Sequence, residues 1–177
     1  SQIMENWVGE EAALELFAHH YETGDVLPKE LLQKIKKSKN FRSGTNCLRQ
    51  LTFGYLDMAW FGQYNDVDNV EEFEKRAVKK TMLREQDTPG ASISTMFAHI
   101  FAGGYSAGYY SYKWAEVLDA DAFEKFQEDG IFNKDTAKSF RDNILSQGNI
   151  SHPLELYKHF RGREPKVEAL LKREGLI

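Results

Sequence analysis

Apolar residues recur every three to four positions over most of the chain, which is the spacing of an amphipathic helix and not the alternation of a strand. The segment 46–62 shows the spacing on two faces. One face consists of Leu48, Leu51, Tyr55 and Met58, and the other of Phe53, Leu56 and Trp60. We therefore expect this helix to pack on two sides, with Asn46 as its N-cap.

The same period, with prolines, glycines and polar caps at the segment ends, predicts helices along the rest of the chain. Their expected ranges are 2–18, 28–37, 70–83, 106–118, 121–128, 134–145, 153–160 and 165–174. Asp121 is the expected cap of the 121–128 helix. No alternating strand pattern interrupts them, so the predicted fold class is all-α, with residues 1–177 in one incomplete domain.

Composition limits the classes of partner. The 177 residues are 41% hydrophobic and 13% aromatic, which is enough for a packed core. The net charge of -4 comes from 23 basic and 27 acidic residues mixed along the chain, so we expect neither nucleic-acid nor membrane binding. The basic run at 34–39 lacks interleaved aromatic residues and is interpreted as a solvated helix end.

Cys47 is the single cysteine of the sequence, which excludes an internal disulfide and a multi-cysteine zinc site. No apolar run approaches the roughly 20 residues that span a bilayer, and residues 1–7 lack a secretory signal pattern. We therefore expect a cytoplasmic protein. Ser1 is followed at once by residues in helical phase, which suggests a cut within a larger protein.

The most informative feature is a row of tyrosines after a glycine pair. Tyr105, Tyr109 and Tyr112 stand four and then three residues apart, directly after Gly103 and Gly104. If residue 106 onward is helical, the three phenols lie on one helix face. Such a row could bind a peptide and polarise its carbonyl group, although aromatic residues at helical spacing more often pack a core.

Three neighbouring features extend this picture. His99 lies one turn before the glycine pair, and the glycines allow either a simple chain reversal or a loop that passes close to a bound peptide. A second set of residues at helical spacing is expected to be core. This set consists of Tyr110, Trp114 and Val117.

Four separated stretches together resemble the thimet oligopeptidase family, and within it the oligopeptidases A and bacterial peptidyl-dipeptidases. The stretches are Phe-Ala-His-Ile-Phe-Ala-Gly-Gly-Tyr-Ser-Ala-Gly-Tyr-Tyr-Ser-Tyr-Lys-Trp at 97–114, Asp-Ala-Phe at 121–123, Phe-Arg-Gly-Arg-Glu-Pro at 160–165 and Ser-Gln-Ile-Met-Glu-Asn-Trp at 1–7. The resemblance implies the carboxyl-terminal, helical part of a zincin-like catalytic domain that hydrolyses short peptides.

The resemblance also implies a zinc cofactor in the full-length enzyme, held by a His-Glu-x-x-His helix and a later glutamate. None of the five histidines here lies in such a motif, and the family's glutamate ligand would stand just before Ser1. We therefore expect no catalytic zinc in this chain by itself. Without the amino-terminal part of the same protein, the isolated fragment is predicted to be inactive.

Roles follow from the resemblance residue by residue. Tyr112, Tyr105 and His99 are the implied catalytic groups, because a preorganised phenol or imidazole stabilises a developing oxyanion. Substrate contact is implied for Tyr109, Gly103 and Gly104. Glu5 is the implied outer partner of a zinc-binding histidine.

Two questions stay open at this level. The family resemblance does not separate a metalloendopeptidase from a peptidyl-dipeptidase that removes carboxyl-terminal dipeptides. Without the resemblance, the chain could also be a noncatalytic all-helical module that binds a peptide or protein through its tyrosines. The late pair Arg161 and Arg163 is expected to fix the carboxyl-terminal segment by ion pairing.

Overall fold

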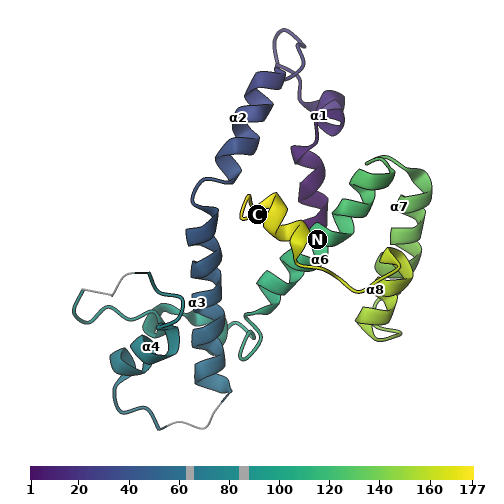
Figure 1. Cartoon of the computed structure of the whole chain (residues 1–177). Helices are drawn as coiled ribbons and strands as arrows, with labels where there is room; N and C mark the ends of the chain where they lie inside the picture. Colours follow the sequence, from purple (N-terminus) through teal and green to yellow (C-terminus); the bar gives the residue numbers. More distant parts are fainter. Residues whose placement is uncertain (63–65, 84–87) are drawn as a thin grey trace. The chain divides into compact units, whose positions relative to one another are not determined.

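The computed structural model describes residues 1–62, 66–83 and 88–177 (Figure 1). Over these ranges the chain forms helices and turns, with one isolated antiparallel bridge between His19 and Val26 and no β-strand. The all-α prediction is confirmed. The chain divides into two compact units, of which unit 1 comprises residues 1–41 and 115–177 and unit 2 comprises residues 42–114.

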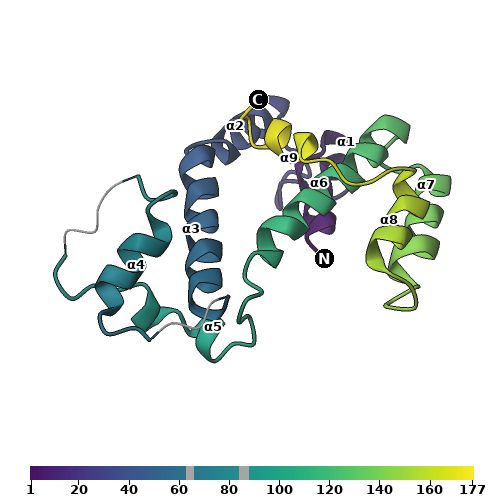
Figure 2. The same ribbon diagram turned by 60° about the horizontal axis from the view of Figure 1, so that its bottom comes forward.

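Unit 1 is built on an aromatic core. Its elements are η1 (Gln2–Gly9), α1 (Glu11–Phe17), α2 (Lys29–Lys39), α6 (Ser111–Asp129) from residue 115 onward, α7 (Lys134–Phe140), the π turn η3 (Arg141–Leu145), α8 (Pro153–Arg161) and α9 (Glu168–Arg173). Helices α7 and α8 lie side by side in Figures 1 and 2, and the rings of Phe140 and Phe160 meet between them at 5.1 Å. Trp7 packs edge-on against Phe123 and Phe126 at 4.8 and 4.9 Å, which ties η1 to α6.

Unit 2 contains the glycine and tyrosine region. Its elements are α3 (Ser43–Phe61), α4 (Val70–Val78), the 3₁₀ turn η2 (Ser94–Met96) and the short α5 (Ala98–Phe101). Helix α4 lies beside α3 in both views (Figures 1 and 2). The core of this unit consists of Leu56, Phe73, Val78, Phe97 and Ile100, and Leu56 and Ile100 are completely buried.

Several predicted helix ends are where local chemistry places them. Helix α7 begins after Asn133, whose side chain accepts the amide protons of Asp135 and Thr136. Helix α8 begins at Pro153, and Gly162 ends it in a left-handed conformation at φ 79°. Helix α4 is shorter than predicted, since it ends at Val78.

Two predicted boundaries near the start of the chain are wrong. The expected helix over 2–18 is interrupted at Glu10, whose extended backbone (φ -96°, ψ 131°) separates a 3₁₀ segment from α1. Asn46 does not cap α3. The helix starts at Ser43 after a left-handed Arg42, and the amide of Asn46 already donates to the Arg42 carbonyl.

Asp121 is not a helix cap either, because α6 runs unbroken through it. Its fully buried carboxylate instead accepts hydrogen bonds from both terminal nitrogens of Arg163, at 3.0 and 2.6 Å, and from the Tyr157 hydroxyl. Arg161 adds ion pairs to Glu124 and Glu128 on the same helix. Both arginines therefore fix the carboxyl-terminal segment to α6. This agrees with the prediction that Arg161 and Arg163 act through ion pairs.

The apolar faces expected to be core are only partly buried. On α3, Phe53, Leu56 and Trp60 pack into unit 2. On the other predicted face Leu48 is half-buried, but Leu51, Tyr55 and Met58 are exposed among the described residues, so the prediction of two packed faces is wrong there. The prediction that Tyr110, Trp114 and Val117 are core residues is also wrong in part. Val117 is buried, whereas Tyr110 and Trp114 are 58% and 49% exposed. A helical period marks one face of a helix without showing that anything covers it.

Candidate functional site

Unit 2 brings four predicted site side chains together: His99, Tyr105, Tyr109 and Tyr112, which we call the tyrosine cluster. Tyr105 and Tyr112 stack with ring centroids 5.3 Å apart, and the Tyr109 ring lies 5.0 Å from Tyr112. The His99 imidazole is 6.0 Å from Tyr105 and 6.1 Å from Tyr109. The four rings, which come from a span of the sequence between His99 and Tyr112, therefore lie in one group.

The tyrosines do not share a helix face, contrary to the sequence prediction. Residues 106–110 form turns, and α6 begins only at Ser111. The turn is closed by the amide of Gly108, which donates to the Tyr105 carbonyl at 2.8 Å. Ala107 adopts a left-handed conformation with φ 53°, which breaks any helical run at this point. Chain reversal, and not helical periodicity, therefore gathers the phenols.

A side chain would be disfavoured at Gly103 and at Gly104 for different steric reasons. A Cβ atom on Gly103 would lie 2.7 Å from the His99 carbonyl oxygen, closer than packing allows. Gly104 has open space around it, but its φ of 79° is a conformation that a side chain disfavours. The pair therefore forms the tight reversal between α5 and the tyrosines.

Helix α3 packs against the tyrosine cluster through Phe53. Phe53 contacts the rings of Phe97 and Tyr109 at 5.2 and 5.7 Å, and the Arg49 guanidinium lies 4.9 Å from the Phe53 ring. Phe97 in turn contacts Tyr109 at 5.0 Å. Because Phe97 is buried in the unit 2 core, Tyr109 is held on one side by packed aromatic rings.

Asp57 is a further residue at this site, and the sequence pattern alone does not single it out. Its side chain has no solvent exposure, and its two carboxylate oxygens accept the amide protons of Ala107 at 2.8 Å and Tyr109 at 2.9 Å. The available signal is an acid one helical turn after Phe53, on a face that is otherwise apolar. A buried carboxylate needs such partners.

Two of the phenols, those of Tyr109 and Tyr112, have a raised pKa. A hydrogen bond with Tyr105 raises the pKa of Tyr112, and partial burial raises it further. Burial also raises the pKa of Tyr109, against the opposing effect of the Arg49 charge. A neutral phenol can donate a hydrogen bond, so Tyr109 and Tyr112 can act as hydrogen-bond donors.

The described residues do not fit a zinc centre. In the three ranges 1–62, 66–83 and 88–177, no three histidine, cysteine, aspartate or glutamate side chains come together in a way that could hold a metal ion. Glu5 lies in η1 of unit 1, where its side chain is exposed. His99 is also exposed, at the rim of the tyrosine cluster.

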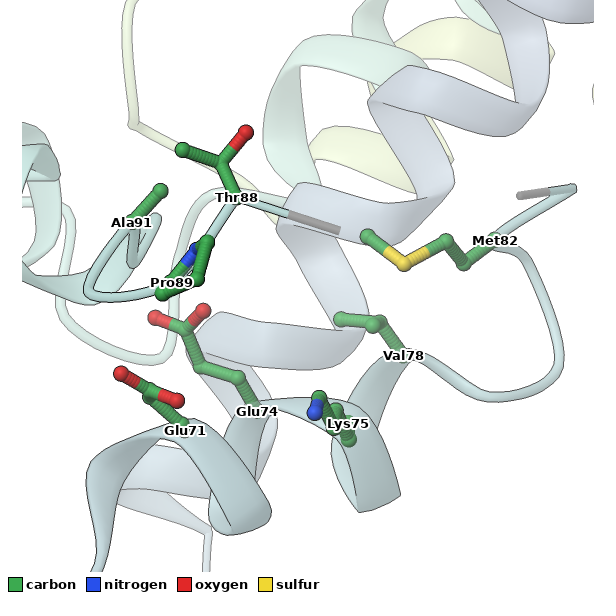
Figure 3. Close-up of a pocket in the computed structure, with 8 residues that line it drawn as sticks. All are labelled: Glu71, Glu74, Lys75, Val78, Met82, Thr88, Pro89 and Ala91. Carbon is green, nitrogen blue, oxygen red and sulfur yellow. The ribbon is translucent and has the colours of Figure 1, made fainter. Parts of the chain in front are cut away.

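A separate cavity of about 250 Å³ lies elsewhere in unit 2, between α4 and the segment 88–91. Figure 3 shows the carboxylates of Glu71 and Glu74 pointing toward Pro89 from α4. The other lining residues are Lys75, Val78, Met82, Thr88 and Ala91. None of the predicted site residues lines this cavity.

Over the described residues, no helix is long and apolar enough to cross a membrane.

Comparisons with known proteins place these residues in a family. The model of peptidase family M3 matches residues 1–176. Oligopeptidase A of Escherichia coli is 47% identical over 177 residues, which are 99% of this chain and 26% of that protein. Dipeptidyl carboxypeptidase of the same organism is 35% identical over 178 residues, with coverages of 99% and 26%.

A plant protein extends the comparison. Organellar oligopeptidase A of Arabidopsis thaliana, named as chloroplastic or mitochondrial, is 42% identical over 183 residues, which are 100% of this chain and 23% of that protein. The chain thus spans about a quarter of the length of the curated relatives that it matches.

Proposed function

The chain belongs to peptidase family M3, and from this membership and the tyrosine cluster we propose that it forms part of a peptidase acting on short peptides. Residues 1–177 are then one portion of its catalytic domain. The observation that carries the proposal is the convergence of His99, Tyr105, Tyr109 and Tyr112 on one surface of unit 2. The names of two relatives, an oligopeptidase and a dipeptidyl carboxypeptidase, support a peptide substrate.

In the proposed role the phenols bind and orient the scissile peptide. Tyr112 and Tyr105 donate hydrogen bonds to the carbonyl oxygen as it gains negative charge, and the raised pKa of Tyr112 supports its role as a donor. Tyr109 and the Gly103–Gly104 reversal line the substrate path. His99, which is exposed beside Tyr105, donates to the substrate backbone or to the same carbonyl.

Zinc belongs to the proposal only for the complete enzyme. We place it on residues outside this chain, because the described residues hold no suitable cluster of ligands. When bound, the metal would supply Lewis-acid chemistry. Glu5 stays a candidate outer partner of a metal-binding histidine. The fragment by itself is expected to be inactive and free of catalytic zinc.

The test is a set of phenylalanine replacements in the complete enzyme. Tyr112→Phe and Tyr105→Phe each remove one hydroxyl and keep the ring, so kcat is expected to fall by about 10² to 10³ for a lost oxyanion donor. Tyr110→Phe is the matched control, because Tyr110 is adjacent but exposed. Unchanged kcat in both Tyr112 and Tyr105 variants would refute the oxyanion role.

The subtype can be decided with one substrate pair. A peptidyl-dipeptidase needs the free carboxyl terminus of its peptide, whereas an endopeptidase does not. Cleavage of an amidated peptide at the rate of the free acid would assign the protein to the endopeptidases. Loss of cleavage on amidation would assign it to the peptidyl-dipeptidases.

The noncatalytic alternative is a helical module that binds a peptide through the same tyrosines. Family membership favours the peptidase, and the upstream reading frame separates the two. A His-Glu-x-x-His motif there supports the peptidase, and its absence supports the module. A cytoplasmic location is part of the same proposal, although one relative is named as organellar.

A further inference from the structure

We propose that Asp57 is a positioning residue that holds the tyrosine-bearing turn in its working conformation, an inference that rests on the proposed peptidase function. Asp57 is completely buried on α3, and its carboxylate accepts the amides of Ala107 and Tyr109 at 2.8 and 2.9 Å. The turn between these amides connects Tyr105 to Tyr112. The carboxylate therefore acts on the cluster through the backbone and touches no reacting atom.

The turn needs such a clamp because its backbone is strained. Ala107 has φ 53°, a left-handed conformation that alanine adopts only at a free-energy cost. Without Asp57, the amides of Ala107 and Tyr109 would lose the side-chain acceptor that they have in this turn. Two hydrogen bonds from consecutive parts of the turn to one buried side chain can hold the strained form.

The rest of the same α3 face is shaped for the turn. Gly54, three residues before Asp57, lies beside the turn, where a Cβ would be in ordinary van der Waals contact with the Tyr110 Cα at 3.9 Å. Phe53, four residues before Asp57, contacts the Tyr109 ring at 5.7 Å. Residues three and four apart share one helix face, so Phe53, Gly54 and Asp57 all lie against the same turn.

Replacing Asp57 should therefore displace the tyrosines more than it changes the core. Asparagine has nearly the same shape, but its amide group presents N–H donors to one of the two backbone amides. A shift of about 1 Å in catalytic groups can lower turnover by about 10². In the complete enzyme, Asp57→Asn is expected to lower kcat by about that factor. KM is expected to change by a smaller factor, because a shifted phenol loses the alignment needed for the reaction before it loses contact with the peptide.

A double-mutant cycle with Ala107→Gly distinguishes positioning from general stability. Glycine accepts a positive φ freely, so the turn needs less help from the clamp. The kcat loss caused by Asp57→Asn is expected to be about fivefold smaller in the Ala107→Gly background. Equal losses in both backgrounds would overturn the proposal.

The control is Glu74→Gln in the same unit. Glu74 is also buried and accepts backbone amides, but from residues 93 and 94, which carry no tyrosine. Its replacement tests whether loss of any buried carboxylate lowers kcat of the folded enzyme. A kcat loss equal to that of Asp57→Asn would assign both effects to stability and overturn the positioning role.

Two further measurements keep the test decisive. Amide exchange of residues 104–110 should accelerate in Asp57→Asn, whether or not the protein is a peptidase, so failure of the proposed function is distinguishable from failure of the clamp. If Asp57→Asn does not fold, Ala107→Val strains the turn from its partly exposed side and leaves α3 intact. It should lower kcat in the same way, and unchanged kcat with unchanged exchange would refute the proposal.

Discussion

Glu74→Gln tests how one buried carboxylate fixes the loop formed by residues 92–94. One carboxylate oxygen accepts the Ser92 hydroxyl at 2.6 Å and the Ser94 amide, and the other accepts the Ile93 amide at 3.0 Å. The Trp60 indole N–H donates to the Ser94 hydroxyl at 2.8 Å, which links the loop to α3. A single acid thus organises three consecutive residues.

The loss of stability expected for Glu74→Gln follows from these hydrogen bonds. Glutamine offers one acceptor oxygen and one NH₂ group, so at least one backbone or hydroxyl donor loses its acceptor. A lost hydrogen bond to a charged group costs about 1.5–3 kcal/mol, and the two remaining bonds become neutral and weaker. We expect the free energy of unfolding of unit 2 to fall by about 3 kcal/mol.

The assay is equilibrium urea unfolding followed by the fluorescence of Trp60. Trp7 of unit 1 and Trp114 at the end of unit 2 are replaced by phenylalanine in every variant, so that the signal comes from Trp60 alone. Glu71→Gln is the matched control, since Glu71 is one turn earlier on α4 and exposed. It should lose less than about 1 kcal/mol, from its interaction with the helix amino terminus. If the free energies of unfolding of Glu74→Gln and Glu71→Gln differ by less than about 1 kcal/mol, the hydrogen bonds of Glu74 do not stabilise unit 2.

The same acid predicts a pH dependence. Burial alone would raise the pKa of Glu74, but the hydrogen bonds from Ser92, Ser94 and Ile93 outweigh burial and lower it. Its contribution to stability is therefore complete above the ordinary glutamate pKa of about 4.3. It is lost as the pH falls through the lower pKa of the folded state. The stability difference from Glu74→Gln should stay constant near neutral pH and shrink below about pH 4.

Three other outcomes are expected. Leu56→Ala should lower the free energy of unfolding of unit 2 by about 2–5 kcal/mol in the same urea assay, because Leu56 is completely buried. Gly103→Ala should accelerate amide exchange of residues 99–105 more than Gly104→Ala, since Gly103 adds a direct backbone clash. Tyr157→Phe should destabilise unit 1 by about 1.5–3 kcal/mol in thermal unfolding, because buried Asp121 loses a donor; an unchanged midpoint would contradict this.

Local rules predicted the helices well where the chain carries explicit start and stop signals. Pro153 begins α8 and Gly162 follows its end, because proline and a left-handed glycine act within one turn. The same rules were wrong at Asp121, which has the chemistry of a cap but lies inside α6. Its carboxylate is satisfied by Arg163, forty-two residues away, and a local reading cannot anticipate that partner.

By itself, the sequence determined an all-helical chain, its family resemblance and the residues of the tyrosine cluster, because residue type and spacing carry that information. Only the tertiary structure decided how those residues meet. The tyrosines converge through a strained turn at Ala107 and not along one helix, and Asp57, distant in sequence, holds the turn. Periodicity describes one element, whereas the position of a turn depends on hydrogen bonds that another element supplies.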